Sequence, residues 1–215
     1  WNTNFNISFN RNKVISLGTN DEPIGGVSWW IGDSNRTAVG HPIGGFWGWE
    51  SDGVYMTQEE FDTQPKHTSS AVGSNRYKDL NDDGIIDEED RTFLGNPNPD
   101  FNYGITNSFS YKNFDLNIVI IGAQGGDKAR TIKEWTEYHG VFNAERYLKD
   151  IWRSPENPGA GVLGSFTQSD FAISTTNTRW IEDASYLSVS NISLGYTLPS
   201  IKHVSNARVF VSAQN

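Results

Sequence analysis

The chain of 215 residues contains no cysteine, which excludes disulfide bonds and thiolate chemistry. Basic residues are also scarce: 17 Lys and Arg stand against 26 Asp and Glu, and the net charge is −9. Nucleic-acid binding depends on clustered Lys and Arg that neutralise phosphates, so this balance argues against a nucleic-acid partner. No apolar run reaches the roughly 18 residues that a transmembrane helix needs.

Leader and catalytic signals are missing as well. No signal peptide is visible and Trp1 is not a natural start, so we expect that the amino end of the protein has been lost. The four histidines are scattered along the chain, without a pair at zinc-binding spacing and without a phosphate-binding loop. Carboxylate pairs such as Glu59–Glu60 occur, but nothing places two of them across a cleft. The chain is therefore not predicted to be an enzyme.

Aromatic residues are abundant, at 13% of the chain, and five segments alternate apolar with small polar residues. In "WNTNFNISFN" every odd position is apolar or Thr, and every even position is Asn or Ser. The other four segments are 102–111, 114–120, 191–198 and 207–215, and in the first of these Asn107 interrupts the apolar face. Such alternation predicts long β-strands, of about nine to eleven residues, each with one apolar and one polar face.

Two kinds of protein have strands of this type. A soluble β-sandwich also alternates, but its strands are usually about five to six residues long and its larger side chains point inward. The polar faces here consist of Asn, Ser, Gly and Thr, which suits a water-filled lumen, and the apolar faces then meet lipid. Tyr103, Tyr111, Phe114 and Tyr196 lie near the strand ends, where aromatic rings sit at the level of lipid headgroups.

The connections between these strands are strongly unequal. Lys112–Asn113 is a turn of two residues and Pro199–Asn206 is short, whereas the connections 18–100 and 122–183 are very long. Outer-membrane barrels combine short periplasmic turns with long outer loops, and compact soluble domains rarely contain loops of this length. The sequence therefore predicts an all-β fold: an antiparallel transmembrane β-barrel segment with long extracellular loops. Short helices are expected in the second loop, for example over 144–152 with Asn143 as N-cap.

The stretch "DLNDDGIIDEED", residues 79–90, has the spacing of an EF-hand calcium loop. Oxygen donors occupy each ligand position, and Gly84 stands at the sharp turn. The predicted metal ligands are Asp79, Asn81, Asp83, the carbonyl of Ile85, Asp87 and Asp90. Asp90 replaces the longer Glu of the usual pattern, which argues for a weaker site. Helices do not flank the loop, so we expect a structural clip that holds Ca²⁺, with Mg²⁺ left open; the alternative is a solvated acidic turn.

Aromatic residues also gather in the first long connection. Rings can stack on sugar faces, so Trp29, Trp30, Trp47 and Trp49 are candidate ligand contacts. Phe46 and Tyr55 belong to the same cluster. The alternative is that the rings of the cluster pack the loop onto the barrel or onto a partner protein.

The run "YKDLNDDGIIDEEDRTFLGNPNPDFNYGITNSFSYKNFDLNI" is the most specific part of a wider resemblance. Together with "VGHPIGGFWGWESDGVY" upstream and "TRWIEDASYLSVSNISLGYTLP" downstream, it resembles the carboxy-terminal barrel of the SusC/RagA family of TonB-dependent outer-membrane transporters of Bacteroidetes. The resemblance covers nearly the whole chain.

This resemblance implies a large barrel, of about 22 strands, plugged by an amino-terminal domain. Residues 1–215 would supply about five or six of the strands, without the plug and the segment that contacts TonB. The implied function is the import of glycans (oligosaccharides) or other nutrients such as peptides through the outer membrane. A SusD-like surface lipoprotein would be the partner and TonB would supply the energy.

The alternative from another class is a secreted β-sandwich carbohydrate-binding module with a structural calcium site. Five apolar side chains distinguish the two, because they face lipid in a barrel and are buried against a second sheet in a sandwich: Phe5, Ile7, Phe109, Leu116 and Ile118.

Overall fold

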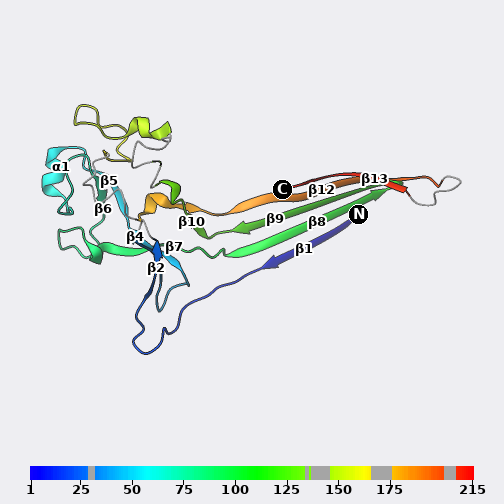
Figure 1. Ribbon diagram of the computed structural model, residues 1–215, viewed down its shortest axis with the longest axis horizontal. Coiled ribbons are helices and arrows are strands. Elements are labelled where there is room, and N and C mark those ends of the chain that lie inside the picture. The colour runs from blue at the N-terminus through cyan, green and yellow to red at the C-terminus, as the bar shows by residue number, and fades with distance from the viewer. Residues whose placement is uncertain (29–31, 134–135, 137–145, 166–175, 201–206) are drawn as a thin grey trace. The chain divides into compact units, whose positions relative to one another are not determined.

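The computed structural model describes residues 1–28, 32–133, 136, 146–165, 176–200 and 207–215 (Figure 1). The chain divides into two compact units. The strand unit contains residues 1–11, 98–127 and 183–215, and the loop unit contains residues 12–97 and 128–182. None of the helices within the described ranges has the length and apolar character needed to cross a membrane.

The described part of the strand unit is an antiparallel sheet of five strands (Figure 1). Their order is β1 (Asn2–Ser8), β8 (Phe101–Tyr111), β9 (Phe114–Gln124), β12 (Tyr186–Leu198) and β13 (Ala207–Gln214). The predicted turn at Lys112–Asn113 joins β8 to β9, and Lys112 adopts a left-handed φ of 53°. Each alternating segment of the sequence forms one of these strands, which confirms the predicted strands.

The register of the sheet aligns like side chains across neighbouring strands. Residues paired across antiparallel strands point to the same face of a sheet. Apolar residues therefore form continuous rows on one side, which we call the apolar face. One such row is Phe5, Ile105, Ile120 and Val189. On the other side, the polar face, one row is Asn2, Ser108, Asn117, Ser193 and Ser212.

A β-bulge preserves the apolar face of β12. Apolar residues stand at odd positions up to Val189 and at even positions from Ile192 onward. The pairing of β12 with β9 shifts between Val189 and Asn191, so Ser190 has no partner of its own in β9. This extra residue rotates the remainder of the strand, and both halves of β12 present their apolar side chains to the same face.

Side chains on the apolar face are exposed, as the barrel interpretation requires. The exposed fractions are 58% for Phe5, 44% for Ile7 and 38% for Phe109. Leu116 and Ile118 are half-buried by their neighbours within the sheet. In a sandwich these five side chains would be buried against a second layer, so the exposures favour the barrel wall.

Aromatic rings mark both ends of the apolar face. Tyr111, Phe114 and Tyr196 share a row at the tight turn, and the ring centroids of Phe114 and Tyr196 are 4.7 Å apart. Tyr103 lies near the other end of β8. Tyr103 and Tyr111 are separated by about 26 Å of strand. For a strand tilted by about 40° this length spans about 20 Å of membrane height, which lies within the roughly 25 Å apolar band of outer-membrane barrels.

Asn107 interrupts the middle of the apolar face, as the sequence indicated. Its Oδ1 accepts hydrogen bonds from the Thr3 hydroxyl at 2.7 Å and from the Trp1 indole N–H at 3.4 Å. The Trp1 ring also stacks on Phe109, with centroids 5.8 Å apart. The polar atom in the apolar band therefore ties β1 to β8.

The loop unit contains small sheets and short helices. One sheet has the order β2 (Ile24–Ser28), β3 (Gly32–Thr37), β4 (Gly45–Trp49) and β7 (Arg91–Gly95), and β5 (Ser51–Val54) pairs with β6 (Asn75–Tyr77). The chain enters and leaves the second long connection through the pair β10 (Asp127–Ala129) and β11 (Ile181–Asp183). Its helices include α1 (Gln58–Thr63) and the 3₁₀ turns η1 (Glu88–Asp90), η2 (Arg146–Asp150) and η3 (Thr178–Trp180). The helix expected over 144–152 is represented by η2, while its proposed cap Asn143 lies outside the described residues.

The two segments of the loop unit are bonded to each other. Trp49 donates its backbone N–H to the carbonyl of Thr176 at 3.0 Å, and Trp49 pairs with Asn177 in a parallel bridge. A Cβ on Gly48 would lie 2.1 Å from the Thr176 carbonyl oxygen, so this close approach requires glycine. The two long connections therefore form one packed body.

Candidate functional site

The polar face of the sheet is the first candidate surface. Its side chains are mostly amides and hydroxyls: Asn2, Asn4, Asn6, Ser8, Asn102, Thr106, Ser108, Ser110, Asn117, Ser188, Asn191, Ser193, Thr197, Ser212 and Gln214. Val119, Ile121, Tyr186 and Phe210 interrupt this pattern. Amides and hydroxyls donate and accept hydrogen bonds without carrying charge.

Only two charged side chains occur in the five strands, Asp115 and Arg208. They form an ion pair with each other on the polar face, with Arg208 Nε 2.9 Å from Asp115 Oδ1. This face of the sheet therefore carries no net charge.

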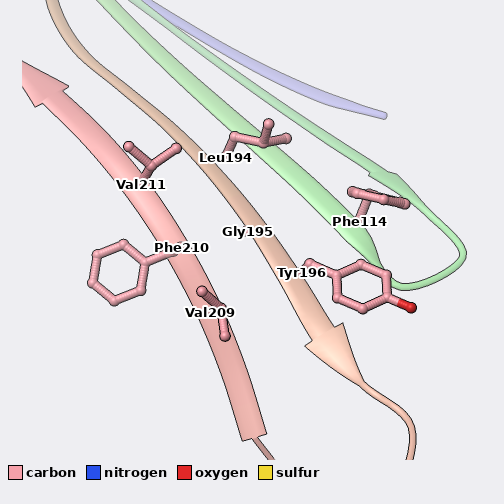
Figure 2. Close-up of a pocket in the computed structure, with 7 residues that line it drawn as sticks. All are labelled: Phe114, Leu194, Gly195, Tyr196, Val209, Phe210 and Val211. Carbon is pink, nitrogen blue, oxygen red and sulfur yellow. The ribbon is translucent and has the colours of Figure 1, made fainter.

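The described surface also has shallow apolar grooves between β12 and β13. One has a volume of about 210 Å³ (Figure 2). Figure 2 shows Leu194 and Val211 at one end of this groove and Phe114 and Tyr196 at the other. A second groove, lined by Leu116, Ile192 and Val211 among others, has a volume of about 260 Å³. Such open, apolar furrows suit contact with hydrocarbon chains better than recognition of a polar ligand.

Residues 79–90, the acidic loop, are held by their own side chains. Asp79 accepts hydrogen bonds from the N–H groups of Asp83 at 3.2 Å and Gly84 at 2.7 Å. Asn81 accepts from the N–H of Asp83 at 3.1 Å, and Asp83 accepts from the N–H of Ile85 at 2.8 Å. Gly84 has a φ of 83°, as expected of glycine at the sharp turn.

Asp90 closes the acidic loop. It is fully buried, and its two carboxylate oxygens accept the N–H groups of Leu80 at 2.7 Å and Asp87 at 2.9 Å. Asp87 caps η1 by accepting the N–H of Glu89 at 2.8 Å. Asp90 therefore joins the two ends of the loop in this structure.

The donor chemistry of the acidic loop fits a hard cation. The loop has seven Asp and Glu and no Lys or Arg, and the predicted ligands are carboxylate, amide and carbonyl oxygens, which Ca²⁺ and Mg²⁺ prefer. Among the described residues, however, no three His, Cys, Asp or Glu side chains are gathered closely enough to hold a metal ion. The carboxylates are instead engaged by backbone N–H groups. Metal binding at Asp79, Asn81, Asp83, Ile85, Asp87 and Asp90 stays a prediction.

Trp49 lies in the interior of the loop unit. It is only 3% exposed, packs with Tyr77 and Ile86, and donates its indole N–H to the carbonyl of Asp87 at 2.8 Å. The Arg91 guanidinium lies 4.6 Å from its ring centroid. Because the ring is almost fully buried, the structure favours for Trp49 the packing role that the sequence left as the alternative.

Trp47 is half-buried in a layer of cations and rings. The Arg36 guanidinium lies 4.0 Å from its ring centroid, and Phe93 meets it edge-on at 5.1 Å. His41 stacks on the other end of this layer, 3.8 Å from Phe93. Sequence reasoning missed this layer, although the alternation of Trp47 with Trp49 indicates that both point to the same face of β4. The candidate ligand contacts Trp29 and Trp30 lie outside the described residues.

Charges brace the start and end of the second long connection. Lys133 Nζ lies 3.1 Å from Glu182 Oε1, and Arg130 Nη1 lies 3.6 Å from it. The hydrogen bond from Lys133 is the main cause of a lowered pKa for the Glu182 carboxyl, and the charges of both basic residues add to it. The sequence contains no motif that indicates these ion pairs, because Glu182 comes from β11 and the two basic residues come from the chain after β10.

Comparison with known proteins identifies relatives of the whole chain. No family model matches. The chain is 31% identical over its full length to the TonB-dependent receptor P26 of Formosa agariphila and 25% identical to the TonB-dependent receptor SusC of Bacteroides thetaiotaomicron. It spans 22% and 21% of these proteins, respectively.

A solved structure shows the same fold. The RagAB peptide importer in its closed-closed state matches 99% of this chain with a TM-score of 0.67 and 19% identity, over 23% of the importer chain. The relatives confirm the predicted family, the antiparallel outer-membrane barrel as the fold class, and the outer membrane as the location.

Proposed function

Since this chain is related over its whole length to the TonB-dependent receptors of the SusC/RagA family, we propose that it forms part of the wall of a nutrient-importing barrel. The observation that carries the proposal is the two-faced sheet. Its apolar face is exposed and bordered by aromatic rings, as in a lipid-facing band, and its polar face is suited to an aqueous lumen. The alternative of a secreted sandwich module has no support from these exposures.

The nutrient that fits this wall is a neutral, hydroxyl-rich solute, and we assign the imported class as glycans. Amide and hydroxyl side chains exchange hydrogen bonds with sugar hydroxyls, whereas charged solutes are selected by rings of opposite charge. The two charged side chains of the strands neutralise each other, which supports this choice.

The partners proposed for the receptor are a SusD-like surface lipoprotein and TonB. The support is the relationship to SusC, together with the packed loop unit, which would offer a preformed surface to a lipoprotein partner. Outer loops that are already bonded to one another lose less conformational entropy when a partner binds.

Uptake by cells tests the import function. Cells that lack only this receptor should fail to take up one class of neutral oligosaccharide, and the gene supplied in trans should restore uptake. Removal of TonB should abolish the same uptake. Normal growth of the receptor-deficient cells on every oligosaccharide tested, with a defect on peptides alone, would contradict the glycan assignment while leaving the import function intact.

We propose further that the acidic loop holds a divalent cation as a structural clip. The spacing of the oxygen donors, the charge of the loop and the left-handed Gly84 support this proposal. A cation that binds only the ordered loop stabilises that loop by mass action. The clip would be local, because the strands of the barrel are held by their own pairing.

Neighbouring acidic residues provide a matched test of the clip. Asp83 is a predicted ligand, whereas Asp82 is not, and Asn tolerates the left-handed φ of 61° at position 82. In the intact receptor, Ca²⁺ should protect the loop from protease in wild type and in Asp82→Asn but not in Asp83→Asn. Equal protection of both variants, or unfolding of the barrel by a chelator, would refute the clip.

Trp47, Trp29 and Trp30 remain proposed glycan contacts. Trp47 is supported by its partial exposure within the layer of cations and rings. Trp47→Ala should weaken oligosaccharide binding to the intact receptor without changing the protease sensitivity of the loop unit. A variant with unchanged binding would assign Trp47 to packing, as for Trp49.

A further inference from the structure

Asp115 and Arg208 are paired across a strand that separates them. Asp115 belongs to β9 and Arg208 to β13, and β12 lies between these strands. In the register of the sheet, Asp115 is opposite Gly195 of β12, and Arg208 is opposite Thr197. The guanidinium therefore reaches diagonally over β12 to arrive at the carboxylate.

The pair makes two hydrogen bonds. Arg208 Nε donates to Asp115 Oδ1 at 2.9 Å, and Nη2 donates to Oδ2 at 2.5 Å. Bidentate contacts of this kind fix both the distance and the orientation of the partners. The geometry therefore holds only when β13 and β9 are correctly aligned with respect to β12.

Gly195 provides the space for this crossing. A Cβ at position 195 would lie 2.3 Å from Arg208 Nη2, 2.5 Å from Nε and 2.6 Å from Cζ. The guanidinium occupies the place where a side chain of β12 would otherwise stand. Because the obstructed atoms form the end of a flexible side chain, an alanine there would displace Arg208 rather than disrupt the strand.

Gly104 is a matched glycine on the same face. The atoms nearest to a Cβ at position 104 would be those of the Asn6 amide, at 3.0 to 3.4 Å. These distances are longer than those at Gly195, so the contact is milder. The atoms met belong to the end of the Asn6 side chain on the neighbouring strand β1, which can rotate away. Gly104 therefore serves as a control for the effects of placing a methyl group on the polar face.

We propose that Gly195, Arg208 and Asp115 form a register lock on the lumen wall. A slip of β13 by one pair of residues, about 7 Å, breaks both hydrogen bonds and leaves each charge alone on an otherwise neutral wall. The lock thus penalises misalignment of β13 during barrel assembly and keeps the wall uncharged. It does not depend on the identity of the transported solute.

The lock predicts that the effect of Gly195→Ala on barrel stability changes sign when Arg208 is replaced as well. Replacement of glycine by alanine in a strand is ordinarily favourable, because alanine loses less conformational freedom on folding. Gly195→Ala should nevertheless destabilise the wild-type barrel, because it expels the guanidinium. In an Arg208→Ala background the obstruction is gone, and the same substitution should be neutral or stabilising.

The experiment measures urea unfolding of the intact receptor in lipid vesicles, with the folded fraction read from gel mobility. Arg208→Ala, Asp115→Ala and Gly195→Ala should each lower the ratio of folded to unfolded protein about two- to fivefold. The double variant Asp115→Ala/Arg208→Ala should be no worse than either single variant, and Gly104→Ala should differ little from wild type.

Two results would overturn the lock. One is additive destabilisation by Asp115→Ala and Arg208→Ala, which means that the two side chains act separately. The other is equal destabilisation by Gly195→Ala with and without Arg208, which means that the glycine serves backbone geometry instead. The exchanged pair Asp115→Arg/Arg208→Asp restores opposite charges. It should therefore recover part of the stability that Asp115→Arg or Arg208→Asp loses alone.

Discussion

Adjacent residues of β9 test the two-faced character of the sheet most directly. Ile118 belongs to the apolar face and Asn117 to the polar face, so a lysine at each position samples opposite sides of the same strand. The two variants, Ile118→Lys and Asn117→Lys, change the net charge equally. Any difference between them therefore reports the environment of each face.

The position of Ile118 sets the expected magnitude. Ile118 shares a row with Asn107, which lies midway between Tyr103 and Tyr111 and thus about 13 Å from each aromatic end. A lysine at the centre of the lipid-facing band costs about 2–4 kcal/mol. This corresponds to a decrease of about 30- to 800-fold in the ratio of folded to unfolded barrel. Asn117 is exposed on the polar face, where a surface substitution costs at most about 0.5 kcal/mol.

Unfolding by urea in lipid vesicles measures both variants under identical conditions. The intact receptor is folded into vesicles, and the folded fraction is read from its mobility on a gel without boiling. Ile118→Lys should shift the transition strongly toward lower urea and Asn117→Lys should leave it nearly unchanged. Equal shifts for the two variants, or a larger shift for Asn117→Lys, would refute the assignment of the two faces.

Three further predictions concern the loop unit, each read from protease sensitivity or amide exchange of the intact receptor. Trp49→Ala removes a buried ring and should destabilise the packed loops by about 3–5 kcal/mol, seen as rapid cleavage within residues 12–97 while the barrel stays folded. Gly48→Ala places a methyl group against the carbonyl of Thr176 and should cost about 1–3 kcal/mol, with cleavage extended to the second long connection. The lowered pKa of Glu182 means that its ion pair with Lys133 stabilises the two ends of the second long connection above pH 4.5 and is lost as the pH falls through the folded-state pKa. The protection factors of the backbone amides of β10 and β11, which are corrected for the intrinsic pH dependence of exchange, should therefore fall there in wild type but not in Glu182→Gln.

The strands could be predicted because a barrel wall imposes a local rule on sequence. Each residue of β1 or β8 faces either lipid or water, so alternation alone identifies the strand and its two faces. The interruption at Asn107 was visible for the same reason. Its bonding to Thr3 was not, because those residues are brought together only by the register between β1 and β8.

The loop unit could not be predicted to the same extent. Its packing depends on contacts between segments far apart in the chain, such as Trp49 with Thr176, and no periodicity encodes such contacts. The tryptophan cluster was therefore open to two interpretations from sequence, ligand contact and loop packing. Burial favours packing for Trp49, and burial is a property of the folded loops and not of the composition of the segment.

The bulge in β12 shows that more could have been read from the sequence. Apolar residues move from odd positions at Leu187 and Val189 to even positions at Ile192 and Leu194. A strand without a bulge would turn one of these groups into the lumen, at the cost of exposing polar side chains to lipid on the opposite face. Because that cost grows with every misplaced residue, a change of parity within one long strand itself predicts an extra residue at the change. The structure places that residue at Ser190, between the two groups. The same requirement, one face for lipid and one for water, thus explains both the regular parts of the wall and its irregularity.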